Sequence, residues 1–121
     1  MIVVTPSNPY VSIGPILAVE DVRGALERRR APCIAVSPLI GGRAVRGPAD
    51  RMLARMAGGT TPAHVAACYE GLIDALVIDE ADAPVDLPAG VRSVVTRTLM
   101  SDAETRRRLA QDVLDAAGAL A

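Results

Sequence analysis

The sequence predicts an α/β protein with a Rossmann-like, mainly parallel sheet of about four strands flanked by helices. Its strand candidates are continuous apolar runs, which are typical of a parallel sheet buried on both faces. Helical patterns lie between most of them. With 121 residues, of which half are hydrophobic, the chain suits a single domain over residues 1–121. The expected strands are Ile2–Val4, Cys33–Val36, Ala75–Ile78 and Val91–Thr96.

Two helices are expected in the first half of the chain. One begins at Asp21 and ends in Arg28–Arg30, where cations complement the negative end of the helix dipole. The other begins at Pro48, a residue suited to the first turn, and runs to about Ala57. Its apolar stripe is expected to hold Leu53 and Met56.

Two further helices are expected in the second half. The first is capped by Thr61, and its buried face follows the spacing i, i+3, i+4, i+7. The last begins with a capping box of Ser101 and Glu104 and runs to about Ala117. Between the last two strands, residues 79–90 have little helix potential and are barely long enough for a parallel crossover. The residues expected to face the core are Val65, Cys68, Tyr69, Leu72, Leu109, Val113 and Leu114.

Two long loops, residues 5–17 and 37–48, each follow a strand and precede a helix. A plain connection of this kind needs about 2–6 residues. In open α/β sheets, ligands bind outside the carboxyl ends of the strands, where helix N-termini suit phosphate. The loops also carry neutral donors, flexible glycines and arginines that can fork onto phosphate oxygens. They predict an anion or nucleotide cleft, with two ordinary turns and solvated arginines as the alternative; the residues concerned are Ser7, Asn8, Ser12, Gly41, Gly42, Arg43 and Arg46.

Composition excludes several classes of function. The net charge is −1 and there is no Phe or Trp, so neither bulk attraction nor stacking platforms for nucleic acid are expected. No apolar run is long enough for a membrane span, and no basic region precedes an apolar segment at the N-terminus. We therefore expect a cytoplasmic protein without nucleic-acid or membrane partners.

The few metal-ligating and redox-active side chains are expected to be structural. Cys33 and Cys68 each lie in an apolar pattern and are expected to be reduced core thiols. His64 is the only histidine and is expected on the surface or at a helix cap. With no second histidine and no CxxC motif, a zinc site is not expected.

The segment VIDEAD, residues 77–82, matches the Walker B strand of DEAD-box helicases. Those proteins also need a P-loop lysine, and this chain has no lysine at all. A helicase is therefore excluded. Asp79, Glu80 and Asp82 could hold Mg²⁺ through water, but a solvated acidic loop is the favoured interpretation.

The two loops together resemble one known family. PSNPYVSIGPILAV, residues 6–19, followed by VSPLIGGRAVRGPADRML, residues 36–53, resembles the 2-phospho-L-lactate transferase family of coenzyme F-420 biosynthesis. VIDEAD and VTRTLM (residues 95–100) also fit the end of that family. The first loop is distantly similar to a nucleotide-sugar-binding family related to the gluconeogenesis factor.

The resemblance implies a Rossmann-like fold, Mg²⁺ and a guanosine-diphospho donor. Such enzymes move a 2-phospholactyl or phosphoenolpyruvyl group to 7,8-didemethyl-8-hydroxy-5-deazariboflavin and release GMP. Asp50, in the first turn of its helix, is expected to cap that helix, with the orientation of an arginine as the alternative. The two loops would bind the substrates on opposite sides, through Thr5, Ser7, Asn8, Ser12 and Gly14 in the first and Ser37, Gly41, Gly42, Arg43 and Arg46 in the second.

The family members are more than twice as long, so the chain resembles the C-terminal part of a larger fold. The Mg²⁺ ligands are expected in the N-terminal half, and no metal ligand or catalytic residue is assigned here. The chain alone is expected to be inactive and to supply part of an active site. The alternatives are a non-catalytic nucleotide- or phosphate-binding module and a structural fragment. Because Ile2–Val4 would be an exposed edge, a homo-oligomer or association with an N-terminal half is expected.

Overall fold

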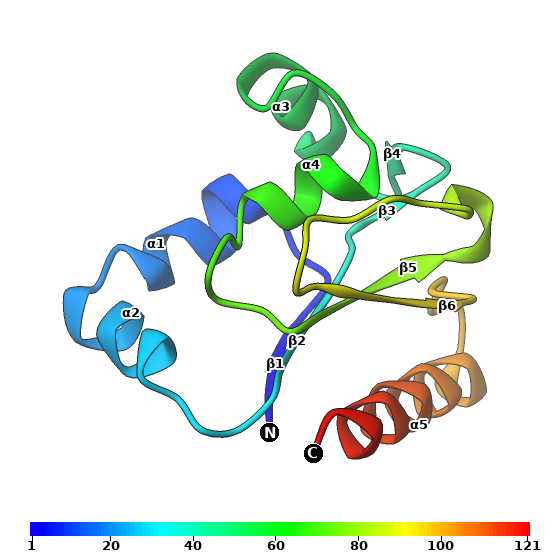
Figure 1. Cartoon of the computed structure of the whole chain (residues 1–121). Coiled ribbons are helices and arrows are strands. Elements are labelled where there is room, and N and C mark those ends of the chain that lie inside the picture. Colours follow the sequence, from blue (N-terminus) through cyan, green and yellow to red (C-terminus); the bar gives the residue numbers. More distant parts are fainter.

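The computed structural model describes all residues from 1 to 121 and contains a parallel sheet between two layers of helices (Figure 1). The strand order is β1-β2-β5-β6, and every neighbouring pair is parallel. The predicted α/β fold with about four parallel strands is therefore confirmed. The strands are β1 (Ile2–Val4), β2 (Cys33–Val36), β5 (Ala75–Asp79) and β6 (Arg92–Thr96).

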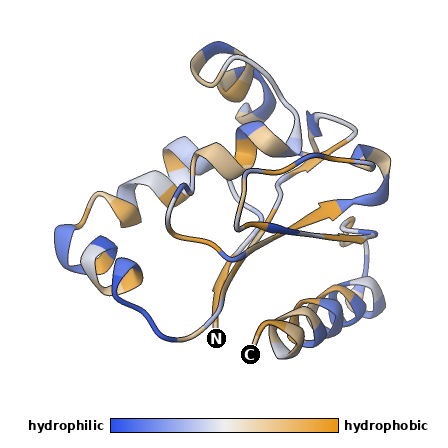
Figure 2. Ribbon diagram, in the orientation of Figure 1, coloured by the Kyte–Doolittle hydropathy of each residue, from blue (hydrophilic) through white to orange (hydrophobic).

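The two layers of helices bury two separate apolar clusters against the sheet. One face is covered by a short wide helical turn and four α-helices, and the opposite face by one long helix (Figure 1). The central strands β2 and β5 are fully buried and stand out as apolar in Figure 2. The elements of the first layer are η1 (Pro9–Ile13), α1 (Gly14–Leu17), α2 (Glu20–Glu27), α3 (Ala49–Met56) and α4 (Pro62–Ala67); the second is α5 (Ala103–Leu120).

The loop expected over residues 5–17 is wrong in its second half, because residues 9–17 are helical in η1 and α1. The Asn8 side-chain oxygen accepts hydrogen bonds from the backbone N–H groups of Tyr10, at 2.9 Å, and Val11, at 3.3 Å. Pro9 then occupies the first helical position, where its missing N–H costs nothing. The prolines and serines of this segment therefore start a helix instead of interrupting one.

The second expected loop contains a small antiparallel hairpin, β3 (Leu39–Ile40) and β4 (Arg43–Ala44). Gly41 and Gly42 form its turn with φ angles of 60° and 74°. Two consecutive residues with positive φ make the tight turn whose twist matches a two-residue hairpin. Glycine is needed at both positions because a β-carbon would strain this backbone.

Two apolar side chains expected in the core are exposed. Met56 is 61% exposed on α3, whereas Leu53 on the same helix is fully buried. Leu114 is 48% exposed on α5, where Leu109, Val113 and Ala117 face the sheet. These two expectations are wrong because each helix presents a narrower apolar face than the sequence pattern suggested.

Two helix boundaries also differ from expectation. Helix α4 ends at Ala67, so Cys68 is only half-buried, although Val65, Tyr69 and Leu72 are buried as predicted. Helix α5 is capped by Asp102, whose side chain accepts a hydrogen bond from Thr105 N–H at 2.8 Å. The capping box expected at Ser101 and Glu104 is thus shifted by one residue to Asp102 and Thr105.

Several structural expectations are confirmed. The crossover between β5 and β6 has no α-helix and holds only the 3₁₀ turn η2 (Glu80–Asp82). Both cysteines are free, and Cys33 is buried. His64 forms a cap on α4, with its Nδ1 atom 2.7 Å from Thr61 Oγ1. None of the helices is both long and apolar enough to cross a bilayer.

Strand β1 lies at one edge of the sheet, as expected. Helix α5 covers one face of the sheet over β2 and β5. The side chain of Val3, on β1, lies beyond this cover and is 38% exposed. An open strand edge beside uncovered apolar surface favours pairing with another chain. We therefore predict that light scattering at micromolar concentration finds oligomers of this chain. A monodisperse monomer would contradict this.

Candidate functional site

A cleft of about 760 Å³ lies at the carboxyl edge of the sheet. Its lining comes from the segment after β1, the segment after β2, the loop between β4 and α3, and the segment after β6. Residues 45–49 and 98–101 contribute continuous stretches of this lining. The cleft thus occupies the position at which parallel α/β sheets bind ligands, and its volume suits a nucleotide-sized molecule.

The structure brings half of the ten predicted binding residues together at this cleft. They come from both loops, so the expectation that the two loops face one site fits the geometry. The predicted residues that line the cleft are Ser7, Asn8, Ser12, Ser37 and Arg46.

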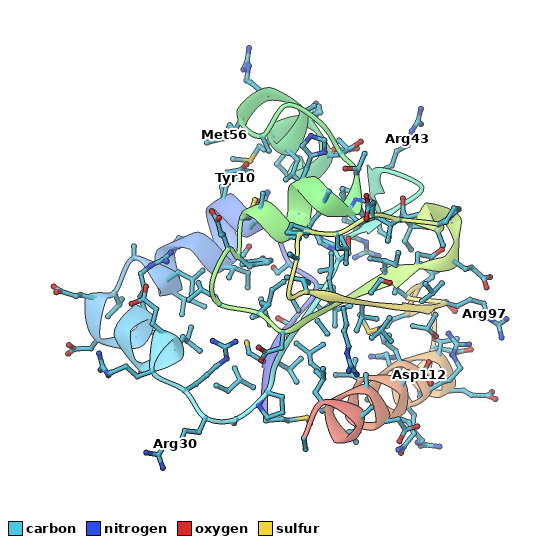
Figure 3. All side chains as sticks on the ribbon, in the orientation of Figure 1. Tyr10, Arg30, Arg43, Met56, Arg97 and Asp112 are labelled. Atoms are coloured by element: carbon cyan, nitrogen blue, oxygen red, sulfur yellow. The ribbon has the colours of Figure 1, made fainter.

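The other predicted residues lie outside the lining. Arg43 extends from β4 into solvent, away from the body of the protein (Figure 3). Thr5 follows β1 and is exposed. Gly41 and Gly42 border a separate, shallower pocket, and their backbone N–H groups donate hydrogen bonds to the Asp82 carboxylate.

Gly14 also lies outside the lining, and packing explains why it is glycine. A β-carbon at this position would lie 2.9 Å from the carbonyl oxygen of Pro9, in the preceding turn. Such a contact is too short for real β-carbons. Gly14 therefore lets η1 continue into α1, a role that needs no ligand.

The polar groups of the cleft differ in whether they already make hydrogen bonds within the protein. The Asn8 oxygen caps η1 and its amide nitrogen lies 3.4 Å from the sulfur of Met52. The Ser37 hydroxyl oxygen accepts a hydrogen bond from Leu39 N–H at 3.2 Å. Ser7 and Ser12 line the cleft without such a backbone role, and Ser12 is exposed. The hydroxyls of Ser7 and Ser12 are the donors best placed to meet a ligand.

The N-terminus of α3 also faces the cleft, through Pro48 and Ala49. Pro48 is the N-cap residue and provides no capping hydrogen bond from its side chain. Asp50 caps from within the first turn, accepting a hydrogen bond from Arg51 N–H at 2.8 Å. Backbone hydrogen bonds, first from Arg51 and then from Ala44, hold the pKa of Asp50 below its ordinary value. The helix N-terminus retains unpaired N–H groups that suit an anion.

The electrostatic character of the cleft is positive. Arg46 is the one charged residue of the lining, and no carboxylate lines it. The two ion pairs of the chain, Arg23–Glu27 and Arg29–Asp74, lie elsewhere, so the Arg46 guanidinium has no acidic partner. A guanidinium without an acidic partner attracts phosphate oxygens, as does the nearby N-terminus of α3, where the N-cap residue Pro48 provides no side-chain hydrogen bond.

The binding residues predicted from the sequence did not include residues 98–101, which form one wall of the cleft. These residues follow β6, so they reach the same edge of the sheet as the two predicted loops. The strand-end rule that identified those loops could have found them as well. Their anchor is Asp79, the last residue of β5, which accepts hydrogen bonds from the N–H and hydroxyl of Thr98 at 2.9 and 3.2 Å.

The acidic segment is not the solvated loop favoured from the sequence. Asp79 is 6% exposed, and its second oxygen accepts a hydrogen bond from Ala81 N–H at 2.9 Å. Burial by itself raises the pKa of Asp79, but the hydrogen bonds from Thr98 and Ala81 outweigh it and lower the pKa overall. Glu80 is exposed, and Asp82 accepts two backbone hydrogen bonds.

These residues do not fit a Mg²⁺ site. The oxygens of Asp79 and Asp82 already accept hydrogen bonds from backbone N–H groups, which a cation would displace. No group of three or more His, Cys, Asp or Glu side chains in the chain could hold a metal ion.

Comparison with known proteins decides the family. Residues 1–117 match the model of the family described as 2-phospho-L-lactate transferase CofD. The chain belongs to the CofD family. This match confirms the resemblance of the two loops and of the segments near the end of the chain, because it extends over all of them.

The CofD relatives of this chain include transferases with two different names. The chain is 38% identical over 122 residues to the phosphoenolpyruvate transferase of Streptomyces griseus, and 41% identical over 119 residues to that of Kitasatospora aureofaciens. It is 29% identical over 120 residues to the 2-phospho-L-lactate transferase of Methanocaldococcus jannaschii. These matches cover 97%, 94% and 99% of this chain but 38%, 37% and 38% of the relatives. The chain therefore spans well under half the length of these CofD relatives.

Proposed function

We propose that this chain forms part of a CofD-type transferase of coenzyme F-420 biosynthesis. The enzyme would move a 2-phospholactyl or phosphoenolpyruvyl group from a guanosine-diphospho donor to 7,8-didemethyl-8-hydroxy-5-deazariboflavin, with release of GMP. The family match over residues 1–117 carries this proposal. The relatives named as phosphoenolpyruvate and 2-phospho-L-lactate transferases support both donors.

Within that enzyme, the cleft at the sheet edge would bind the diphosphate of the donor. Arg46 would neutralise phosphate charge, the N-terminus of α3 would donate N–H groups, and Ser7 and Ser12 would donate from the opposite side. Holding the diphosphate in this way fixes the phosphorus atom for in-line attack by the acceptor hydroxyl.

The rim of the cleft suits a ring system. Four large apolar side chains that line the cleft are also solvent-exposed, although exposed apolar surface of this kind has a hydration cost. A guanine or deazaflavin ring covering them would remove that surface from water. The four residues are Val11, Val45, Leu99 and Met100.

The Mg²⁺ ligands of the proposed enzyme would lie in the rest of the protein, since the carboxylates of Asp79 and Asp82 already accept hydrogen bonds from backbone N–H groups. An N-terminal half or a second copy of the chain would complete the site, and the reaction would take place in the cytoplasm.

A non-catalytic nucleotide-binding module is the second candidate. It is supported by the same engagement of Asp79 and Asp82, which leaves the cleft with binding groups but no free carboxylate in its lining. GDP binding without any GMP release from a guanosine-diphospho donor, even with the N-terminal half of a CofD relative added, would favour this candidate over the transferase.

The test is a calorimetric titration of the chain with GDP. We expect the wild-type chain to bind GDP and Arg46→Ala to bind about tenfold more weakly, since a charge-assisted contact contributes about 1.5–3 kcal/mol. Arg30→Ala is the matched control. Arg30 projects into solvent, far from α3 and the hairpin (Figure 3), so its loss changes net charge equally and is expected to leave the affinity unchanged.

Two results would count against the assignment. Absence of GDP binding at millimolar concentration would contradict binding by these residues. Equal weakening by Arg46→Ala and Arg30→Ala would show a general charge effect and would rule out a specific contact from Arg46.

A further inference from the structure

Two carboxylates of the acidic segment Asp79–Asp82 accept hydrogen bonds from the β3–β4 turn and from Thr98. Both of these segments lead into the cleft lining, although no residue of the acidic segment lines the cleft itself. We propose that Asp79 and Asp82 are positioning residues that hold the 98–101 wall and the β3–β4 hairpin in fixed relation to β5. The inference rests on the proposed function for its link to nucleotide binding. The geometry of the two walls can be tested without a nucleotide.

Asp82 fixes the hairpin at its tip. Its Oδ1 accepts a hydrogen bond from Gly42 N–H at 2.8 Å, and its Oδ2 accepts one from Gly41 N–H at 3.1 Å. Two parallel bonds from one carboxylate restrain both the position and the orientation of this turn. The strand that leaves the turn, β4, leads directly into Val45 and Arg46 of the cleft lining.

Asp79 fixes the other wall at its beginning. One carboxylate oxygen binds both the N–H and the hydroxyl of Thr98, the first residue of the 98–101 wall. The other oxygen binds Ala81 N–H and so starts the turn η2. This turn carries the chain on to Asp82, so only two residues, Glu80 and Ala81, separate the two aspartates.

The location of β5 explains why the segment Asp79–Asp82 can bind both the 98–101 wall and the β3–β4 hairpin. Strand β5 pairs with β6 along one side, and its end lies between β6 and the β3–β4 hairpin (Figure 1). Neither carboxylate has a cationic partner, since the two ion pairs of the chain involve other residues. Neutral backbone donors hold both carboxylates, as expected for restraints on backbone position.

The test compares Asp82→Asn with Asp86→Asn in the full chain. An asparagine at 82 keeps one acceptor oxygen and turns an NH₂ group toward a backbone N–H, so one of the two bonds is lost. Asp86 lies in the same loop, is exposed, and makes none of the hydrogen bonds of the acidic segment. Both variants remove one negative charge, so the control isolates the lost bond. Asp82→Glu keeps the carboxylate and serves as the conservative variant.

Two readouts separate the inference from the proposed function. Without nucleotide, amide NMR signals of residues 45–47 are expected to shift in Asp82→Asn and not in Asp86→Asn. With GDP, Asp82→Asn is expected to bind about fivefold more weakly, corresponding to about 1 kcal/mol, with Asp82→Glu close to wild type. If the wild type binds no GDP, the proposed function fails, while the shifts at 45–47 still decide the positioning role.

Thr98→Val tests the other wall with little risk to folding. It removes the hydroxyl that binds Asp79 and keeps the N–H. We expect amide signals of residues 99–101 to shift and GDP binding to weaken two- to threefold, an order-of-magnitude figure for one lost hydrogen bond. Signals that change only at residues 41–42 and 98, with unchanged 45–47 and 99–101, would overturn the inference.

Discussion

Asp79→Ala is expected to lower the free energy of unfolding by about 3 kcal/mol at pH 7, since buried donors left unpaired cost about 1–3 kcal/mol each. The variant removes the acceptor for the N–H and hydroxyl of Thr98, which is itself buried. Ala81 N–H also loses its partner, but Ala81 is exposed and water can replace the lost bond. Urea unfolding followed by circular dichroism measures the change, because the chain has no tryptophan for fluorescence.

The pH dependence of this effect has a definite sign. The folded pKa of Asp79 lies below its unfolded value of 3.8. Its charged form therefore stabilises the fold fully above pH 3.8, and this stabilisation is lost as pH falls through the folded pKa. The stability gap between wild type and Asp79→Ala should be constant from pH 5 to 7 and should narrow below about pH 3.8. A gap that widens toward low pH would contradict the assigned hydrogen bonds.

Leu53→Ala is expected to cost about 2–5 kcal/mol, the usual range for a fully buried leucine. Leu53 is completely buried and packs α3 into the larger apolar cluster with Ala49. The N-terminus of α3 lines the cleft, so loosening this helix should also weaken GDP binding. The free energy of unfolding and the dissociation constant for GDP are the two quantities to measure.

Met56→Ala is the matched control on the same helix. Met56 is 61% exposed and projects from the outer end of α3 (Figure 3). Alanine is an excellent helix former, so the change should lie within about 0.5 kcal/mol of zero. Similar costs for both substitutions would mean that α3 presents a different face to the core than the structure shows.

The parallel sheet could be predicted from sequence because its signal is strong and local. Cys33–Val36 and Ala75–Ile78 are apolar throughout, which is typical of a parallel strand covered on both sides. The approximate position of the cleft followed from the same alternation of strands and helices, whereas the order of the strands in the sheet was not predicted. The predicted cleft residues Ser7, Ser12 and Arg46 lie where that rule places them.

The helical start at residues 8–9 and the role of the Gly41–Gly42 turn could not be predicted, because these residues fit more than one local structure. Asn8 and Pro9 fit both a loop and a helix start, and only the capping geometry distinguishes the two. Gly41 and Gly42 predict an anion-binding turn as well as a hairpin turn, and here Asp82 occupies their N–H groups. The pairing of Asp82 with that turn spans 40 and 41 residues, a distance at which sequence patterns carry no information about contacts.

An amide NMR titration of the chain with GDP tests whether the nucleotide binds in the cleft at the carboxyl edge of the sheet. Binding in the cleft predicts that GDP shifts the amide signals of Ser7, Ser12, Ser37 and residues 45–47, 49 and 98–101, which come together only in the folded cleft. Signals around Arg30 and Arg92, at the opposite end of the sheet, should not move. Shifts centred on that opposite end, or no shifts at saturating GDP, would contradict nucleotide binding in the cleft.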